Sequence, residues 1–112
     1  MFDLTDKKAL ITGASGGIGG AIARVLHGQG ATVTLSGTRE KNLDALASNL
    51  SGRVHVIASD LSSPKGAQQL VDDAGRAMGE INILVNNAGL TRDKLAIRMT
   101  DEDWERVLGV NL

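Results

Sequence analysis

The chain has 112 residues, of which 42% are hydrophobic and 22% charged, as expected for one globular domain with a modest core. Its net charge of -1 gives no bulk attraction to nucleic acid or to an acidic membrane surface. The absence of cysteine excludes disulfides, thiolate metal sites and cysteine nucleophiles. No apolar run has the length of a signal peptide core or of a transmembrane helix, so a cytoplasmic protein is expected.

Segments with strand and helix character alternate along the chain. The strand-like segments are short apolar or β-branched runs, at 8–12, 31–36, 54–57 and 81–85. The third begins with an alternating pattern, which favours an edge position. The helix-like segments carry apolar residues at helical spacing, over 17–29, 39–50, 63–78 and 100–112. This order predicts one α/β domain over residues 1–112, with a parallel sheet and helices on both of its faces.

A glycine-rich turn joins the first strand to the first helix. Gly13, Gly17 and Gly19 have the spacing G-x-x-x-G-x-G. Glycines let the backbone bend tightly and approach a ligand, and a helix N-terminus offers free N–H groups to an anion. We therefore expect the phosphates of a dinucleotide to contact the residues of this turn, Gly13, Ala14, Ser15, Gly16, Gly17, Ile18 and Gly19. A plain strand-to-helix turn without a ligand is the alternative.

The end of the second strand bears on the choice of cofactor. NAD-binding proteins usually place a carboxylate there for the ribose 2′-hydroxyl, whereas an arginine accommodates the 2′-phosphate of NADP. Here Gly37 stands at the ribose position, and Thr38 and Arg39 follow it. Arg39, helped by Thr38 or Ser36, is expected to bind a 2′-phosphate, which favours NADP(H). The alternative is that Arg39 is a solvated residue in the first turn of the next helix.

Two further motifs complete a pattern. Asp60-Leu61 follows the third strand, and Asn86-Asn87-Ala88-Gly89 follows the fourth. Together with the glycine turn, in this order and at these intervals, they resemble the short-chain dehydrogenase/reductases across the whole chain. The run 89–104 is similar to that of the 3-oxoacyl-[acyl-carrier-protein] reductases of fatty acid synthesis. The resemblance implies half of a Rossmann-type doubly wound sheet, with four strands in the order 3-2-1-4.

The resemblance also implies roles for the residues of these two motifs. Asp60 would accept a hydrogen bond from the adenine amino group, and Leu61 would lie near the adenine ring. Asn87, Ala88 and Gly89 would border the adenine-side ribose while their turn braces the central strands. The alternatives are that Asp60 only caps the next helix and that the turn has a purely structural role.

The last expected helix carries Trp104, Val107 and Leu108 on one face, and Asn111 falls on the same stripe. The resemblance implies that Asn111 joins a serine, a tyrosine and a lysine in the catalytic set, although a frayed chain end is an equally good interpretation. The chain contains no tyrosine. It is therefore expected to be the N-terminal, cofactor-binding half of a reductase, catalytically inactive by itself.

Partner predictions follow from the same half-fold. Without a fifth strand, residues 83–85 would form an exposed apolar edge, so a homodimer through this edge or the adjacent helices is expected. Arg92, Lys94 and Arg98 would meet an acyl carrier protein, or else lie in a solvated loop. The alternative function is a self-assembling structural half-fold with little or no cofactor binding. His27 and His55 are expected at the surface, and no metal site is predicted.

Overall fold

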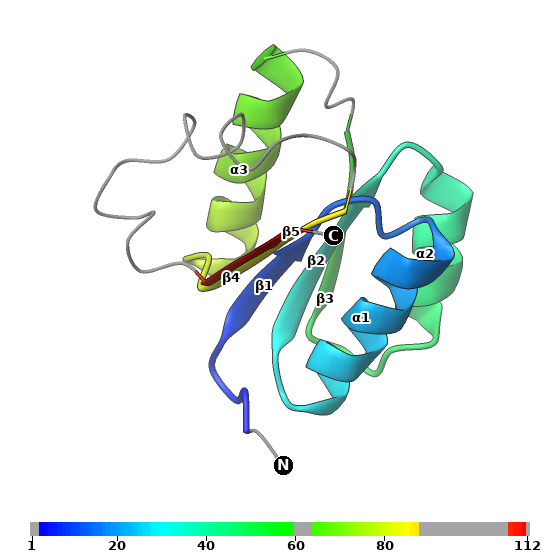
Figure 1. Ribbon diagram of the computed structural model, residues 1–112, viewed down its shortest axis with the longest axis vertical. Helices are drawn as coiled ribbons and strands as arrows, with labels where there is room; N and C mark the ends of the chain where they lie inside the picture. The colour runs from blue at the N-terminus through cyan, green and yellow to red at the C-terminus, as the bar shows by residue number, and fades with distance from the viewer. Residues whose placement is uncertain (1–2, 60–63, 88–107, 112) are drawn as a thin grey trace.

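The computed structural model describes residues 3–59, 64–87 and 108–111. Within these residues, parallel strands form one sheet with helices on both sides, as Figure 1 shows. The elements, in chain order, are β1 (Lys8–Ile11), α1 (Gly17–Gly28), β2 (Thr32–Gly37), α2 (Glu40–Ser48), β3 (Val54–Ala58), α3 (Pro64–Met78), β4 (Ile83–Asn86) and β5 (Leu108–Asn111). Up to β4, each expected strand and helix is present, with ends shifted by at most two residues from the predicted ranges.

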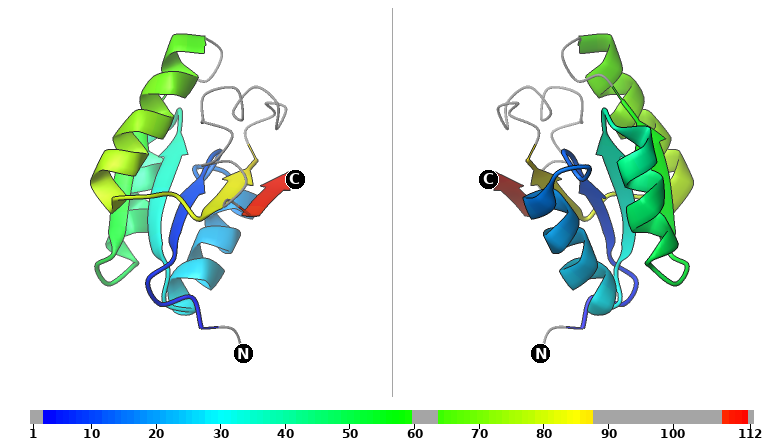
Figure 2. Two further views of the ribbon diagram at one scale, coloured as in Figure 1. Left: turned by 90° about the vertical axis from the view of Figure 1, so that its left-hand side faces the viewer. Right: turned by 90° about the vertical axis from the view of Figure 1, so that its right-hand side faces the viewer.

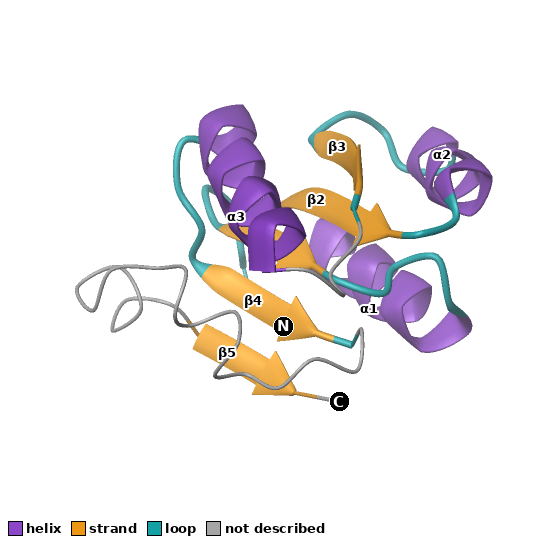
Figure 3. Ribbon diagram, turned by 90° about the horizontal axis from the view of Figure 1, so that it is seen from above, coloured by secondary structure: helices purple, strands orange, loops and turns teal. Residues whose placement is uncertain are grey.

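The sheet has the order β3-β2-β1-β4-β5, and each neighbouring pair is parallel. The predicted order 3-2-1-4 is confirmed, and so is the edge position of β3. Because the strands are parallel, their carboxyl ends lie along one edge of the sheet (Figure 3). The turns after β1, β2 and β4 therefore meet at that edge.

The structure corrects the expectation for the end of the chain. Leu108–Asn111 is a strand, not part of a helix, and it pairs with β4 so that Asn86 lies opposite Asn111. A short apolar run is ambiguous between helix and strand, and here the hydrogen-bonding ladder with β4 decides it. Gly109 within the run also disfavours a helix. The edge of β4 is thus covered, so the expected homodimer through that edge is wrong.

The core lies in two layers, one on each face of the sheet. On one face, α1 and α2 pack against β1 and β2, as Figure 2 shows from two sides. On the other face, α3 packs against Leu10 and Leu84. Successive residues of β1 point to opposite layers, so Ala9, Leu10 and Ile11 are all fully buried. This double burial explains why β1 reads as a continuous apolar run rather than an alternating one.

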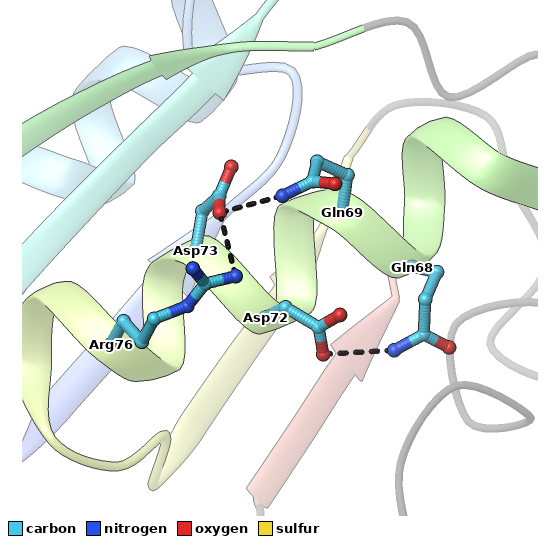
Figure 4. Close-up of polar contacts among 5 residues, drawn as sticks. All are labelled: Gln68, Gln69, Asp72, Asp73 and Arg76. Carbon is cyan, nitrogen blue, oxygen red and sulfur yellow. Dashed lines mark hydrogen bonds and ion pairs between the residues drawn. The ribbon is translucent and has the colours of Figure 1, made fainter.

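The outer face of α3 is polar. Gln68 donates to Asp72 at 2.9 Å and Gln69 donates to Asp73 at 2.8 Å, both one turn apart, as Figure 4 shows. Arg76 forms an ion pair with Asp73 at 3.2 Å. Pairs of this kind on an exposed helix contribute about 0.2–0.5 kcal/mol each. The helix is therefore held mainly by its apolar face, which buries Ala67, Leu70, Ala74 and Met78.

Glycines with a left-handed backbone follow two of the helices. Gly30 has φ 106° after α1, and Gly79 has φ 90° after α3, values that side-chain-bearing residues rarely adopt. Neither α1, α2 nor α3 has both the length and the apolar character needed to cross a membrane, and these are the helices of the described residues.

Candidate functional site

The three glycines of the G-x-x-x-G-x-G motif after β1 lie in three different environments. Gly13 has φ 64°, a left-handed conformation that turns the chain sharply at the end of the strand. A Cβ on Gly19 would collide with the Gly13 carbonyl oxygen, so only glycine lets α1 start so close to the turn. A Cβ on Gly17 would meet nothing within 4 Å, so no protein contact demands glycine there. The space beside the start of α1 is open at this position.

The Gly13 carbonyl is a central acceptor of this turn. It accepts a hydrogen bond from the Gly16 N–H at 3.2 Å. The side-chain amide of Asn87, in the turn after β4, donates to it at 3.4 Å. The Ala14 N–H in turn donates to the Ser36 carbonyl of β2 at 2.9 Å. The glycine turn is thereby held from β2 on one side and from the end of β4 on the other.

A buried hydroxyl links the ends of β1 and β4. Thr12 is fully buried, and its hydroxyl donates to Oδ1 of Asn86 at 3.2 Å. Oγ1 of Thr12 also accepts the Asn87 N–H at 3.0 Å, while the Thr12 N–H donates to the Val85 carbonyl at 2.9 Å. A polar residue at the end of a buried strand needs such partners, so Thr12 could have been recognised from its position after Ile11. This network fixes where the two turns lie relative to each other.

The N-terminus of α1 faces this edge with free donors. Gly16 is the N-cap, and no described side chain caps the helix. The Gly20 N–H donates to the Gly16 carbonyl at 3.0 Å, so the N–H groups of Gly17, Ile18 and Gly19 come before the first bond of the helix. The first turn contains no acidic residue. Free N–H groups and the positive end of the helix dipole make this an anion-binding position.

The end of β2 borders the same turn. Gly37 lies against Ser15, and the Asn42 side chain of α2 donates to the Ser15 carbonyl at 3.4 Å. Thr38 and Arg39 are exposed, and Arg39 is the N-cap of α2. Among the described residues, neither of their side chains has a polar partner. The structure therefore brings Thr38 and Arg39 to the edge of the sheet that carries the glycine turn, with the Arg39 guanidinium available to an anion.

The remaining predicted residues are placed only in part. Asp60, Leu61, Ala88 and Gly89, as well as the basic residues of the expected loop, Arg92, Lys94 and Arg98, lie outside the described residues. The Ser59 N–H donates to the Gly37 carbonyl at 3.1 Å, which places the residue before Asp60 beside the end of β2. Asn111 ends β5 opposite Asn86, at the same edge of the sheet.

One histidine prediction is wrong. His27 is only 7% exposed, and its Nε2 donates to the Gly52 carbonyl at 2.8 Å. It lies at the C-terminal end of α1, away from the glycine turn, and its periodic position in the helix was the one signal for its burial. His55 is half-buried. Within residues 3–59, 64–87 and 108–111, no group of histidine and acidic side chains has the arrangement of a metal site.

Comparison with known proteins gives consistent matches. Residues 7–112 match the family model described as short chain dehydrogenase. The whole chain is 54% identical to nodulation protein G of Rhizobium sp. (strain N33) and 46% identical to the 3-oxoacyl-[acyl-carrier-protein] reductase FabG of Rickettsia felis. It covers 46% and 45% of these two proteins, so it spans about half the length of the curated relatives it matches.

Solved structures agree with this similarity. The RhlG/NADP active-site complex of Pseudomonas aeruginosa superposes with a TM-score of 0.73 at 39% identity, over 80% of this chain and 37% of that one. The 3-ketoacyl-(acyl-carrier-protein) reductase of Brucella melitensis, complexed with NADH, superposes with a TM-score of 0.74 at 28% identity, over 94% of this chain and 43% of that one. One of these neighbours holds NADP and the other NADH, so the comparison does not decide between a cofactor with a 2′-phosphate and one without it.

Proposed function

Because the chain belongs to the short-chain dehydrogenase family, we propose that residues 1–112 are the dinucleotide-binding part of an NADPH-dependent 3-oxoacyl-[acyl-carrier-protein] reductase. Such an enzyme converts a 3-ketoacyl thioester to a 3-hydroxyacyl thioester in fatty acid synthesis. The names of several similar proteins support this substrate class. The cofactor assignment rests on one observation: the first N–H groups of α1, next to the glycine turn, have no acceptor in the helix and no side-chain cap.

The residues at that edge fit a dinucleotide. The N–H groups of Gly17, Ile18 and Gly19 would bind the pyrophosphate, supported by Gly13, Ala14, Ser15 and Gly16 of the turn. A Cβ on Gly17 would have no protein neighbour within 4 Å, which is the opening that a closely approaching phosphate needs. The protein itself requires Gly13 and Gly19, and we assign the need for the third glycine, Gly17, to the ligand.

The end of β2 supports NADP(H) over NAD(H). A carboxylate for the ribose 2′-hydroxyl would have to stand at the position of Gly37. Arg39 and Thr38 are exposed beside it, and their side chains have no polar partner among the described residues. A guanidinium forms strong, often bidentate hydrogen bonds with phosphate. We assign the 2′-phosphate to Arg39, with Thr38 as a second donor.

The adenosine end of the site uses the two other motifs. Asp60 and Leu61 would hold the adenine, since Ser59 just before them is bonded to Gly37. Asn87, Ala88 and Gly89 would border the ribose on that side. The main-chain N–H of Asn87 is already used by Thr12, and its side-chain amide donates to Gly13. Asn87 would therefore act chiefly by fixing the turn that the phosphates contact.

The nicotinamide, when bound, supplies the hydride for the 3-keto group. This chain contains Asn111, which pairs in register with Asn86 at the edge of the sheet that carries the glycine turn, but it contains no tyrosine to donate a proton. We therefore expect no measurable reduction of a 3-ketoacyl thioester by the 112-residue chain with NADPH. Steady oxidation of NADPH that depends on both the chain and the thioester would contradict this.

Two partner assignments remain predictions. Arg92, Lys94 and Arg98 would give the acidic acyl carrier protein a basic contact. Self-association would use the helices beside the β4–β5 side of the sheet, because the edge of β4 itself is occupied by β5. Light scattering of the chain at micromolar concentration tests the second of these, and a monomer mass would contradict it.

Calorimetric titration with NADPH and with NADH tests the cofactor assignment. We expect saturable binding of both, with NADPH bound about tenfold more tightly, which corresponds to about 1.4 kcal/mol. Arg39→Ala should remove this difference by weakening NADPH alone. Arg24→Ala, which removes another exposed arginine on α1, is the matched control and should change neither affinity. No binding of either cofactor at millimolar concentration would instead support the self-assembling structural half-fold.

A further inference from the structure

Gly37, the last residue of β2, has a side chain of the glycine turn directly against it. A Cβ built on Gly37 would lie 2.7 Å from Oγ of Ser15, 3.3 Å from Cβ of Ser15 and 3.3 Å from its nitrogen. The first distance is shorter than real Cβ contacts allow, and the other two are tighter than most. The backbone of Gly37 is not in the left-handed region, so its conformation alone would accept a side chain. The close contact with Ser15, and not the φ angle of Gly37, therefore disfavours a side chain at this position.

Ser15 can relieve only part of this conflict by rotating. Rotation about χ1 moves Oγ but leaves its Cβ and nitrogen in place. The backbone around Ser15 is fixed on three sides. Asn42 donates to the Ser15 carbonyl, Ala14 N–H donates to Ser36, and Gly16 N–H donates to Gly13. A side chain at position 37 would therefore press on the turn that carries the phosphate-binding N–H groups.

We propose that Ser15 helps to determine the preference for NADP(H) over NAD(H), because its side chain occupies the space that the Cβ of an acidic residue at position 37 would need. The proposal rests on the proposed function and deepens it. Discrimination against NAD(H) then depends on both Ser15 and Gly37, and not only on the absence of a carboxylate at position 37. Introducing an acid at position 37 makes NADH the more tightly bound cofactor only when Ser15 is made smaller at the same time.

The steric part is tested without any cofactor, by thermal unfolding of Gly37→Ala, Ser15→Gly and the double variant. In the Ser15 background, Gly37→Ala should lower Tm by about 4 °C because the new methyl group is crowded. In the Ser15→Gly background, the same substitution should leave Tm unchanged or raise it, because replacing an unstrained glycine stabilises. Gly75→Ala, whose new Cβ has no neighbour within 4 Å, is the control and should raise Tm in both backgrounds. Equal effects of Gly37→Ala in both backgrounds would overturn the proposal.

The specificity part is tested by titrating NADPH and NADH against Gly37→Asp and the Ser15→Gly/Gly37→Asp double variant. Gly37→Asp alone should weaken both cofactors by about tenfold, since the phosphate-binding turn is displaced. The double variant should bind NADH more tightly than NADPH. A full switch to NADH by Gly37→Asp alone would overturn the proposal. If the unaltered chain binds neither cofactor, the proposed function fails, while the unfolding cycle still decides whether Ser15 excludes a side chain at position 37.

Discussion

The two ends of α1 differ in whether their terminal backbone groups have hydrogen-bond partners in the protein. At its C-terminus, the carbonyls of Val25, Leu26 and His27 accept N–H groups from the residues that follow the helix. Arg53 adds guanidinium donors to the His27 and Ala31 carbonyls, the latter at 2.8 Å. At its N-terminus, three N–H groups have no acceptor in the helix, and no described side chain caps them.

The difference agrees with the proposed binding of the cofactor at the N-terminus of α1. Unpaired backbone groups are costly when they are withheld from water, so proteins usually provide a partner. Here the protein provides partners at the C-terminus, whereas the N-terminal N–H groups lie beside a turn that is held by hydrogen bonds. Thr12, Gly13 and Asn87 make those hydrogen bonds, and a Cβ on Gly17 would meet no protein atom within 4 Å. Changes at the open end should therefore alter ligand binding, whereas changes at the closed end should alter stability alone.

Gly19→Ala is expected to have the largest effect. Its methyl group would collide with the Gly13 carbonyl, which is backbone and cannot rotate away. We expect a loss of about 3 kcal/mol in unfolding free energy and loss of measurable NADPH binding. Gly28→Ala, at the closed end of the same helix, is the matched control because its new Cβ would meet nothing within 4 Å. Similar urea denaturation curves for the two variants would contradict the expected difference between the two ends of α1.

Thr12→Val is expected to have the second-largest effect. The substitution keeps the shape of the side chain but leaves the Asn87 N–H and the Asn86 side chain without their shared hydroxyl. Leaving the Asn87 N–H without its acceptor costs about 2 kcal/mol, and NADPH affinity should fall because the turn is less well fixed. Thr12→Ser retains the hydroxyl and should recover most of both losses in urea denaturation and calorimetry. An equal loss in the serine variant would point to packing instead.

Arg53→Ala tests the closed end. It removes the donors to His27 and Ala31, and we expect a loss of about 1 kcal/mol with NADPH affinity unchanged. Arg53 has φ 53°, a strained value for alanine, so Arg53→Gly should be less destabilising than Arg53→Ala by about 1 kcal/mol. Chemical denaturation and calorimetry measure the two quantities separately. Weaker NADPH binding in either variant would show that the two ends are not independent.

Asp3→Asn should have the smallest effect. Hydrogen bonds from the Thr5 hydroxyl and N–H lower the pKa of the Asp3 carboxyl below its ordinary value of 3.8. The charged form is therefore favoured in the folded chain, and its contribution is complete above that value and is lost as the pH falls through the lowered pKa. Wild type and Asp3→Asn should differ slightly in stability at pH 6 and converge near pH 2. Parallel curves would exclude any contribution from this carboxylate.

Most of the fold could be predicted from the sequence because β1 to β4 have strong local signals. The runs 8–12 and 31–36 are apolar or β-branched, and glycines mark the helix ends. The strand Leu108–Asn111 was missed because its residues fit helical and extended patterns equally, and pairing with β4 is a long-range interaction. The glycine turn was recognised by its spacing. The contacts of Ser15 with Gly37, and of Thr12 with Asn87, depend on distances that no spacing reveals.

The place of β1 at the centre of the sheet has a consequence for how the chain folds. β1 precedes every other strand in the sequence, but it pairs with both β2 and β4. On a ribosome adding about 5–20 residues per second, β1 emerges several seconds before β4. During that time it has a partner on one side only. The pairing of β1 with β4 joins residues far apart in the sequence, so we expect it to form later than the helices, whose contacts are local.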